Sequence, residues 1–202
     1  MANRPDEAAL MLQAAVEEDP GNEKAYLYLA FSYEQLGKNT TAVETLKRGL
    51  QTAALYRKDF YFNLGNNYFK LGMQDLAEEM FTQAIRTDTR FSEGYLNRAN
   101  SRMNGTKYRE ALADYRMYLT LDPGSVQREK IERLISLLSA YLAEEEQRKL
   151  DEEQRRLEEA ERQQKLLDSV LKTLDSIGGD TQNLSADSED IIEYEDGLDI
   201  LD

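Results

Sequence analysis

The sequence of 202 residues contains no cysteine and no histidine. The chain therefore has no disulfide, no zinc site of the usual ligand types, no thiol nucleophile and no imidazole general base. Long apolar runs are also missing, and the segment Met1–Pro5 lacks the apolar stretch of a signal peptide. We expect a soluble chain without a membrane segment and, by default, a cytoplasmic location; a longer parent chain that carries a signal or membrane segment stays an alternative.

Basic residues are absent from one end of the chain. Residues 1–124 hold 15 Lys and Arg against 17 Asp and Glu, whereas residues 178–202 hold nine Asp and Glu and no Lys or Arg, within a net charge of −14. No part of this pattern predicts a surface that neutralises phosphates, so we expect neither nucleic acid nor an anionic membrane as a partner. Neutral or basic proteins and peptides remain as partners.

A motif recurs along the first 124 residues. An aromatic residue, a leucine, a small residue and a second aromatic residue return after 35 residues and, less completely, after a further 34. This period is typical of stacked helix–turn–helix pairs, in which small residues let two helices approach and glycine permits the turn. The copies comprise Tyr26, Leu29, Ala30, Tyr33, Gly37, Ala42 and Leu46; then Tyr61, Leu64, Gly65, Tyr68, Gly72, Ala77 and Phe81; then Tyr95, Ala99, Gly105 (one place early at the turn), Ala111 and Tyr115; half a copy, with Ala8, Leu12 and Ala15, precedes them.

The motif resembles the tetratricopeptide repeat, most clearly in Tyr61-x2-Leu64-Gly65-x2-Tyr68 and Ala77-x3-Phe81. The resemblance covers roughly residues 6–124 and implies an all-α solenoid of helical hairpins. Arg98 and Arg102 depart from it, because they replace the usual leucine and aromatic residue. The expected parts are a closing helix of a partial unit (1–22), three repeats (23–57, 58–91 and 92–124), a capping helix (125–143), a charged extended helix with an amphipathic end (144–177) and an acidic, disordered tail (178–202).

The resemblance also implies a peptide-binding groove, lined by the first helix of each pair. The asparagines of this face recur at an interval of 34 residues, and a side-chain amide can both donate to and accept from a peptide backbone. An alternative stays open, in which asparagine is merely common on this face and the phenylalanines pack between repeats. The predicted groove residues are Lys24, Leu27, Phe31, Glu34, Asp59, Phe62, Asn63, Asn66, Phe69, Lys70, Glu93, Asn97, Asn100 and Asn104.

The carboxylate clamp, with which some members of the family hold acidic chaperone tails, is disfavoured. It requires basic residues at positions where this chain has Leu27, Glu93 and Asn97, and only Asn63 fits it. The acidic residues of the predicted groove instead favour a neutral or basic ligand. No glycine-rich phosphate loop, nucleophile elbow or metal-ligand cluster is present, so we expect no enzyme activity, no cofactor and no metal.

The segment after the repeats predicts one long helix or two abutting helices. Ile131, Leu134 and Leu138 share one face that would cap the last repeat, and Ser125 is the expected N-cap. Residues 144–165 pair acid with base four residues apart, which favours a solvated helix, because they supply too few apolar positions for a stable coiled coil. Residues 166–177 regain an apolar face, which would fold back on the solenoid, dimerise or bind a partner.

The acidic tail interleaves apolar residues with Asp and Glu. It cannot bury enough apolar surface to fold alone, so we expect disorder. One interpretation is a solubilising tail, and the other is a linear motif formed by Ile191, Ile192, Tyr194, Leu198, Ile200 and Leu201.

The sequence thus predicts a non-catalytic adaptor that binds a protein or peptide in the groove. The alternative is a self-assembling structural subunit, because the array begins in the middle of a repeat and leaves one helix face without its usual neighbour. A longer natural chain, a second copy or residues 166–177 would each cover that face.

Overall fold

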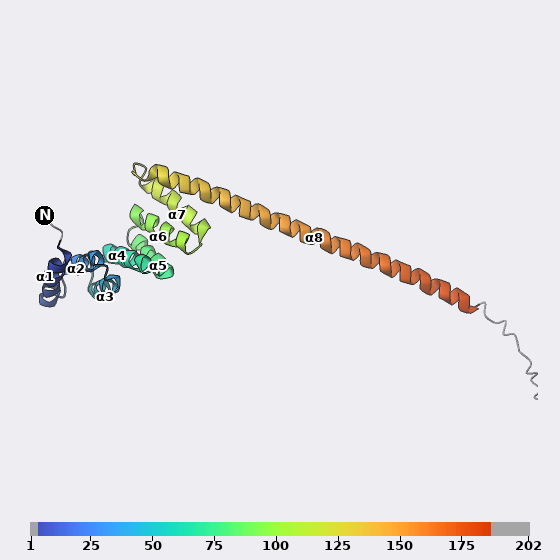
Figure 1. Ribbon diagram of the computed structural model, residues 1–202, viewed down its shortest axis with the longest axis horizontal. Helices are drawn as coiled ribbons and strands as arrows, with labels where there is room; N and C mark the ends of the chain where they lie inside the picture. The colour runs from blue at the N-terminus through green and yellow to red at the C-terminus, as the bar shows by residue number, and fades with distance from the viewer. Residues whose placement is uncertain (1–3, 187–202) are drawn as a thin grey trace, which may run out of the picture. The chain divides into compact units, whose positions relative to one another are not determined.

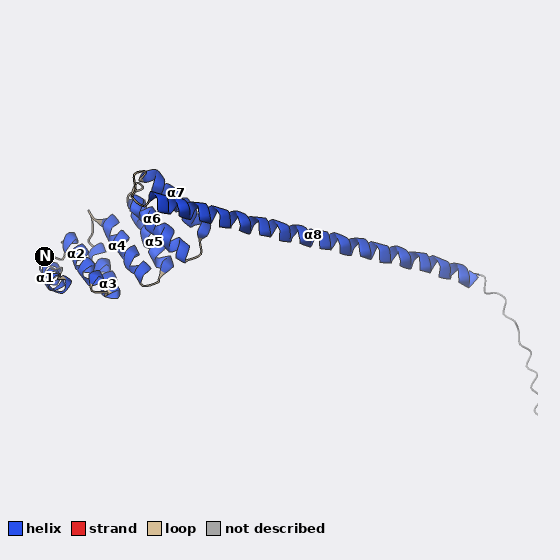
Figure 2. Cartoon of the chain, turned by 45° about the horizontal axis from the view of Figure 1, so that its top comes forward, coloured by secondary structure: helices blue, strands red, loops and turns tan. Residues whose placement is uncertain are grey.

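The computed structural model describes residues 4–186, and only the backbone for residues 178–186. Every regular element in this part of the chain is a helix, as Figure 2 shows. The helices are α1 (Pro5–Glu18), α2 (Glu23–Gln35), α3 (Asn39–Leu50), α4 (Arg57–Lys70), α5 (Gln74–Thr87), α6 (Ser92–Asn104), α7 (Tyr108–Leu121) and α8 (Arg128–Ala186). The chain forms two units, residues 1–144 and 145–202.

The first unit is a stack of helical pairs. The pairs are α2 with α3, α4 with α5 and α6 with α7, and α1 precedes them as a single helix (Figure 1). From α1 to α7 each helix packs against the next one in the chain, and the first helices α2, α4 and α6 also contact one another in sequence. This arrangement confirms the predicted all-α solenoid of hairpins.

The turn between the two helices of each pair contains one residue with a left-handed backbone conformation. Gly37 and Gly72 take this position in the first two pairs, with φ of 71° and 75°. In the third pair the position falls on Thr106, with φ of 60°, and not on Gly105, which the sequence pattern placed at the turn. The closing backbone bond is nevertheless kept, because the Lys107 amide donates to the Arg102 carbonyl over 2.8 Å. The third turn therefore carries a strained β-branched residue.

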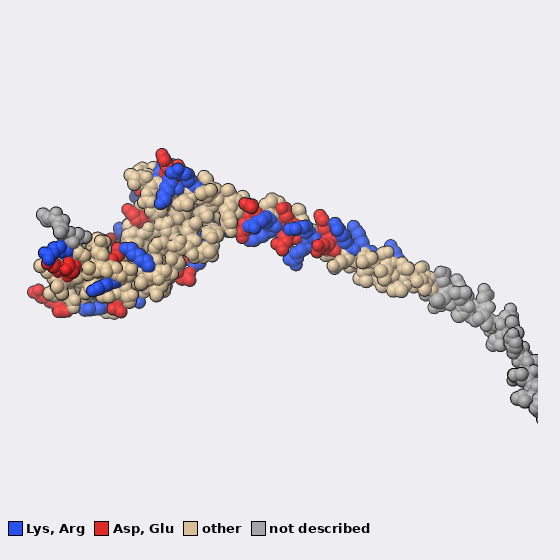
Figure 3. Space-filling view, in the orientation of Figure 1, with Lys and Arg blue, Asp and Glu red and all other residues tan. Residues whose placement is uncertain are grey.

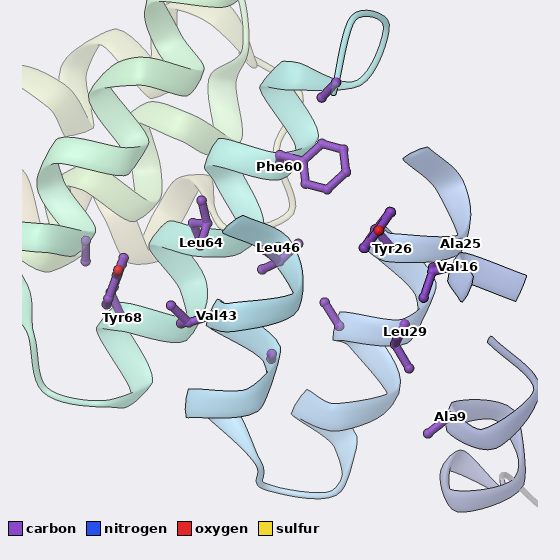
Figure 4. Packing of buried hydrophobic residues seen from close by; sticks show 14 of the residues in the cluster. Ala9, Val16, Ala25, Tyr26, Leu29, Val43, Leu46, Phe60, Leu64 and Tyr68 are labelled. Atoms are coloured by element: carbon purple, nitrogen blue, oxygen red, sulfur yellow. The ribbon is translucent and has the colours of Figure 1, made fainter. Parts of the chain in front are cut away.

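The apolar core divides into two clusters. The first extends from α1 to α5 and includes Leu46, Phe60 and Leu64, which Figure 4 labels, and also Phe81, all of them at most 1% exposed. The second joins α6, α7 and the start of α8. Burying one such large side chain contributes about 1.5–3 kcal/mol relative to its exposure, so both clusters hold several helices together.

A charged seam, formed by Arg98, Arg102, Asp114, Glu78 and Lys107, lies where the two clusters meet. Arg98 donates two hydrogen bonds to Asp114, over 2.8 and 2.7 Å, and Arg102 donates a third over 2.7 Å. Arg102 and Lys107 each donate to Glu78 over 2.8 Å. The two arginines that depart from the repeat pattern are therefore matched by carboxylates on α5 and α7.

The contacts within the charged seam shift the pKa values of Glu78 and Arg98. Burial opposes the charged form of Glu78, but hydrogen bonds from Lys107 and Arg102 outweigh burial and lower its pKa. Burial likewise opposes the charge of Arg98, and the hydrogen bond to Asp114 raises its pKa in spite of this. The seam is thus a network of paired ions at neutral pH.

Helix α8 begins three residues later than predicted. Ser125 caps the turn that leads into it: the Ser125 hydroxyl accepts from the Gln127 amide over 3.1 Å and bonds the Tyr118 hydroxyl, and the Ser125 carbonyl accepts from the Arg128 amide over 3.1 Å. Ile131 and Leu138 belong to the second cluster. The start of α8 therefore caps the third pair, as its amphipathic pattern predicts.

The second unit contains the remainder of α8. Every described side chain from 146 to 177 is exposed. Lys149 pairs with Glu145 over 3.1 Å and Arg162 with Glu158 over 3.9 Å. On the face drawn in Figure 3, the mixed charges of this helix are followed by a stretch in which no charged side chain is visible. The exposed apolar residues of that stretch are Leu166, Leu167, Val170, Leu171, Leu174 and Ile177.

The prediction that the helix ends and the tail begins at residue 178 is wrong. The helix continues through Gly178 and Gly179 to Ala186. Each glycine costs about 1 kcal/mol relative to alanine, but a long helix already formed adds residues without a new nucleus. The remainder of the predicted disordered tail, residues 187–202, lies outside the described residues.

Candidate functional site on the first helices

A cavity of about 190 Å³ opens on the first helices, and we call it the inner cavity. Its lining comes from α2, α4, α5 and α6. Six of the predicted groove residues meet there, together with one residue that the sequence analysis did not include. The lining residues are Glu34, Asn66, Phe69, Lys70, Asn97 and Asn100, with Phe81 as the addition.

Two asparagines join the second and third pairs across the cavity. The Asn97 amide nitrogen donates to the Asn66 side-chain oxygen over 2.8 Å. Asn100 is the counterpart of Asn66 in the next repeat, and Asn97 lies one helical turn before it on the same face of α6, so stacking of the pairs brings Asn97 against Asn66. Within residues 4–177 the side-chain nitrogen of Asn66 and the side-chain oxygen of Asn97 make no hydrogen bond. One donor group and one acceptor therefore remain for a ligand.

Asn100 is held by the second cluster. The Tyr115 hydroxyl donates to its side-chain oxygen over 2.8 Å. Burial raises the pKa of Tyr115 to about 12, so the hydroxyl keeps its proton at neutral pH. Because the oxygen of Asn100 is occupied, its amide nitrogen is the group left to donate.

The charged residues of the cavity neutralise each other. Lys70 on α4 donates to Glu34 on α2 over 2.7 Å, and the buried Asn67 donates to the same carboxylate over 3.1 Å. Asn67 also donates to the Asn63 carbonyl of its own helix over 2.9 Å. The cavity lining therefore carries one paired acid and base and no net charge.

Phe69 and Phe81 are the aromatic residues of the lining. Phe81 is buried and belongs to the second helix of its pair, which is why a search restricted to first helices missed it. A β-carbon added to Gly65 would lie 2.5 Å from the Phe81 ring. The missing side chain thus lets the ring reach under α4, and glycine at a position where the other repeats have alanine was the signal for it.

The other predicted groove residues lie outside the inner cavity. Phe62 packs against two aromatic rings of its own repeat, with ring centroids 5.8 Å from Phe81 and 4.9 Å from Phe91. Asn63 donates to the Asp59 carbonyl over 2.8 Å, Leu27 packs on the first cluster, and Lys24 lies 5.5 Å from the Tyr56 ring. Glu93 and Asn104 are exposed.

Phe31 belongs to a separate depression at the start of the stack, which we call the N-terminal hollow. This hollow has a volume of about 270 Å³. Its lining comes from α1 and α2 and consists of Pro5, Ala8, Leu12, Tyr28, Phe31, Ser32 and Gln35. The predicted groove therefore divides into two distinct depressions.

Family models agree with this geometry. A tetratricopeptide repeat model matches residues 1–58, and a second one matches residues 59–90. This chain is a tetratricopeptide repeat protein. Its third repeat pair, α6 with α7, lies beyond the matched ranges but keeps the turn and the stacking of the first two. No curated protein sequence matches the chain.

Solved structures share the tetratricopeptide fold. A crystal structure of MamA superposes with a TM-score of 0.63 at 20% identity, over 69% of this chain and 79% of MamA. The first such domain of human RPAP3 gives 0.55 at 23% identity, over 63% and 97%. A structure of the first RPAP3 domain bound to an HSP90 peptide gives 0.54 at 23% identity, over 60% and 93%. At these identities the likeness concerns the fold.

Tetratricopeptide repeats are typically non-catalytic protein-interaction modules. Among the side chains that the structure describes, residues 4–177, no group of three acidic residues is arranged to hold a metal ion. No helix of the described chain is long and apolar enough to cross a membrane. The predicted tail motif of Ile191, Ile192, Tyr194, Leu198, Ile200 and Leu201 lies outside the described residues.

Proposed function

We propose that this repeat protein is a non-catalytic adaptor that holds a segment of another protein against α2, α4 and α6, with the inner cavity at the centre of the site. The observation that carries the proposal is the convergence of three asparagines with unused amide groups on an aromatic lining. The three asparagines are only half-buried, so water solvates these groups in the free chain and a peptide backbone can replace it.

The chemistry of the lining fits a peptide backbone. The Asn66 and Asn100 nitrogens can donate to peptide carbonyls, and the Asn97 oxygen can accept from a peptide amide. The half-buried ring of Phe69 provides the accessible apolar surface for one ligand side chain, and the buried Phe81 adds little to it. Hydrogen bonds to the peptide backbone are compatible with many peptide sequences. The apolar side chain of the peptide would therefore determine which sequences bind best.

The charges favour a neutral segment within the neutral or basic class that the sequence predicts. Glu34 is paired with Lys70, so it adds no uncompensated negative charge to the cavity. An acidic peptide tail is a poor fit, because Leu27 and Glu93 stand where a carboxylate clamp needs basic residues. The RPAP3 domain with its HSP90 peptide supports the general mode of binding and not that ligand for this chain.

A peptide-display selection on the full chain tests the proposal. We expect enriched peptides to be uncharged around one apolar residue. The double variant Asn66→Ala/Asn97→Ala should weaken them about tenfold, because each lost hydrogen bond costs about 0.5–1.5 kcal/mol. Asn104→Ala, on the same helix as Asn97 but outside the cavity, is the matched control and should bind normally.

A shortened chain that ends at Leu174 distinguishes binding at the inner cavity from binding at the tail. Equal affinity of the full and shortened chains supports the cavity, whereas binding by the full chain alone makes the tail the recognition element and overturns the proposal.

Self-assembly is the second candidate function. The observation in its favour is the exposed apolar stretch of α8 between Leu166 and Ile177. Sedimentation of the full chain over a range of concentrations decides it. A constant monomer mass removes this candidate, and a dimer that Leu171→Glu dissociates would establish it.

A further inference from the structure

Exposed leucines of α8 recur with a period of seven residues. Leu150, Leu157 and Leu171 belong to one series, and Leu167 and Leu174 to a second series offset from the first by three residues. All five are between 47% and 60% exposed. Two series with this offset are the a and d positions of a seven-residue repeat, labelled a to g, and they form one stripe along a helix. The stripe, which we call the heptad stripe, consists of Leu150, Glu153, Leu157, Ala160, Gln164, Leu167, Leu171 and Leu174.

The heptad stripe extends across both the charged and the apolar part of α8. Residues 144–165 by themselves hold too few apolar positions for a coiled coil, but the helix continues unbroken beyond them, so three further leucines join the same stripe. Six of its eight residues are then apolar. A register that instead includes Val170 and Ile177 would bring Arg156 into the stripe and is less apolar.

The two sides of the heptad stripe differ in charge. The e side carries Gln154, Glu161, Asp168 and Asp175, and the g side carries Lys149, Arg156, Gln163 and Val170. In two parallel helices each g residue faces the e residue five positions later in the other helix. In two antiparallel helices the acidic e side would instead face a second acidic e side. The charges therefore favour a parallel arrangement.

Arg156 and Glu161 form the pair that favours a second copy of this chain. Two parallel copies would place each Arg156 against Glu161 of the other copy, so the symmetry gives two ion pairs. Neither residue makes a hydrogen bond or an ion pair within residues 4–177. Lys149 differs in this respect, because it already pairs with Glu145 over 3.1 Å. The charges of Arg156 and Glu161 are thus available to a second copy.

We propose that the heptad stripe is the surface through which two copies of this chain associate, as a parallel coiled coil in register. The inference rests on self-assembly, the second candidate function, and specifies its surface, its orientation and its register. It is independent of the ligand held at the inner cavity.

Two polar residues of the stripe determine its register and limit its stability. Gln164 would meet Gln164 of the other copy, whereas a shift by one heptad would place it against a leucine. In the single chain its amide donates to Asp168 over 2.9 Å, an exposed bond that the pairing would exchange. Glu153 would meet a second Glu153, and this repulsion weakens the pair. We therefore expect an association that depends on concentration.

Sedimentation equilibrium of the full chain tests the surface. The mass should rise with concentration from 23.2 kDa towards twice that value. Leu157→Glu, on the stripe but outside the apolar stretch of residues 166–177, should abolish the dimer. Leu166→Glu, within that stretch but off the stripe, is the matched control and should leave the dimer intact. A dimer that Leu166→Glu dissociates and Leu157→Glu does not would preserve self-assembly and overturn the heptad stripe.

A gain of affinity gives a test that loss of folding cannot imitate. Glu153→Leu removes the two facing carboxylates and should strengthen the dimer by about tenfold or more. Glu159→Leu, at a c position on the outer side of the helix, should not strengthen it. Unchanged affinity in Glu153→Leu would overturn the proposed face.

The ion pair is tested by exchanging its charges. Arg156→Glu should weaken the dimer about tenfold, because both interhelical pairs become repulsive, and Arg156→Glu/Glu161→Arg should restore it. Arg155→Glu makes the same change at an outer f position and should have no effect. Circular dichroism verifies that helicity is equal in all variants. An affinity that the charge exchange does not restore would contradict the pairing.

The orientation is tested by a disulfide, since the chain has no cysteine of its own. In a parallel dimer in register, Leu150→Cys brings two thiols to the same level of the stripe, so mild oxidation should link the copies. Asp151→Cys, on the outer side, should not be linked. A dimer in which Leu150→Cys stays unlinked would overturn the parallel arrangement. A constant monomer mass would overturn the whole inference and remove the second candidate function, while the peptide-display selection judges the inner cavity separately.

Discussion

The second and third repeats pack their helices in the same geometry but with different chemistry. In the second repeat a glycine meets an aromatic ring, as Gly65 does with Phe81. In the third, two arginines meet the carboxylate of Asp114, which is 3% exposed. A substitution destabilises an apolar contact when it creates a clash or a cavity. A substitution destabilises a buried ion network when it removes one charged partner and leaves the other unpaired. The same packing geometry of a helical pair can therefore be stabilised by an apolar contact or by an ion network.

The largest effect is expected at Asp114. Asp114→Ala leaves the guanidinium groups of Arg98 and Arg102 without their shared carboxylate, and breaking a buried pair costs about 3–5 kcal/mol. Urea unfolding followed by circular dichroism measures the loss. Asp75→Ala is the matched control, because Asp75 pairs with Lys107 at an exposed site and such pairs contribute about 0–1 kcal/mol. Equal stability of the two variants would contradict the role of the charged seam.

The apolar contact of the second repeat is tested by Gly65→Ala. The new methyl group would lie 2.5 Å from the Phe81 ring, and overpacking of this kind costs about 1–3 kcal/mol. The double variant Gly65→Ala/Phe81→Leu recreates the pairing of Ala30 with Leu46 in the first repeat, so it should recover part of the loss. A double variant less stable than Gly65→Ala alone would show that the ring is not the obstacle.

Acid should weaken the third repeat through Glu78. Its pKa in the folded chain lies below the ordinary 4.5, so its contribution to stability is present above pH 4.5 and is lost as the pH falls through the folded pKa. Glu78→Gln should therefore lose less stability than the unaltered chain between pH 5 and pH 3. Urea unfolding at a series of pH values, with the exposed neighbour variant Glu79→Gln as control, measures this difference; identical profiles for all three chains would refute it.

The smallest effect is expected at the turns. Thr106→Gly relieves a left-handed backbone at a β-branched residue and should stabilise the chain by about 1 kcal/mol. Gly72→Ala, at the equivalent turn of the second repeat, should destabilise it by a similar amount. Thermal unfolding compares the two, and a loss of stability in Thr106→Gly would mean that the threonine side chain makes a compensating contact.

The sequence predicted the parts of the fold that follow from periodicity. The positions of Ala30, Gly65 and Ala99 predicted the pairing of the helices, because only small residues permit that approach. The charged seam could not be foreseen, since its carboxylates lie 12 to 24 residues from their arginines and meet only in the folded stack. The left-handed position at Thr106 was missed because glycine stands beside it.

Periodicity also predicted part of the lining of the inner cavity. The period of 34 residues placed Asn66 and Asn97 on one face, and their contact follows from the stacking. It could not show that Lys70 neutralises Glu34, or that Phe31 would belong to another depression. Those results depend on side-chain directions between neighbouring repeats, which one repeat does not encode by itself.

The central claim is that the first helices hold the ligand at the inner cavity. Amide hydrogen exchange of the full chain, with and without a peptide from the display selection, tests it most directly. The account predicts slower exchange in α4 and α6 around Asn66 and Asn97 when the peptide is bound. Protection confined to residues 145–202, with α4 and α6 unchanged, would contradict it.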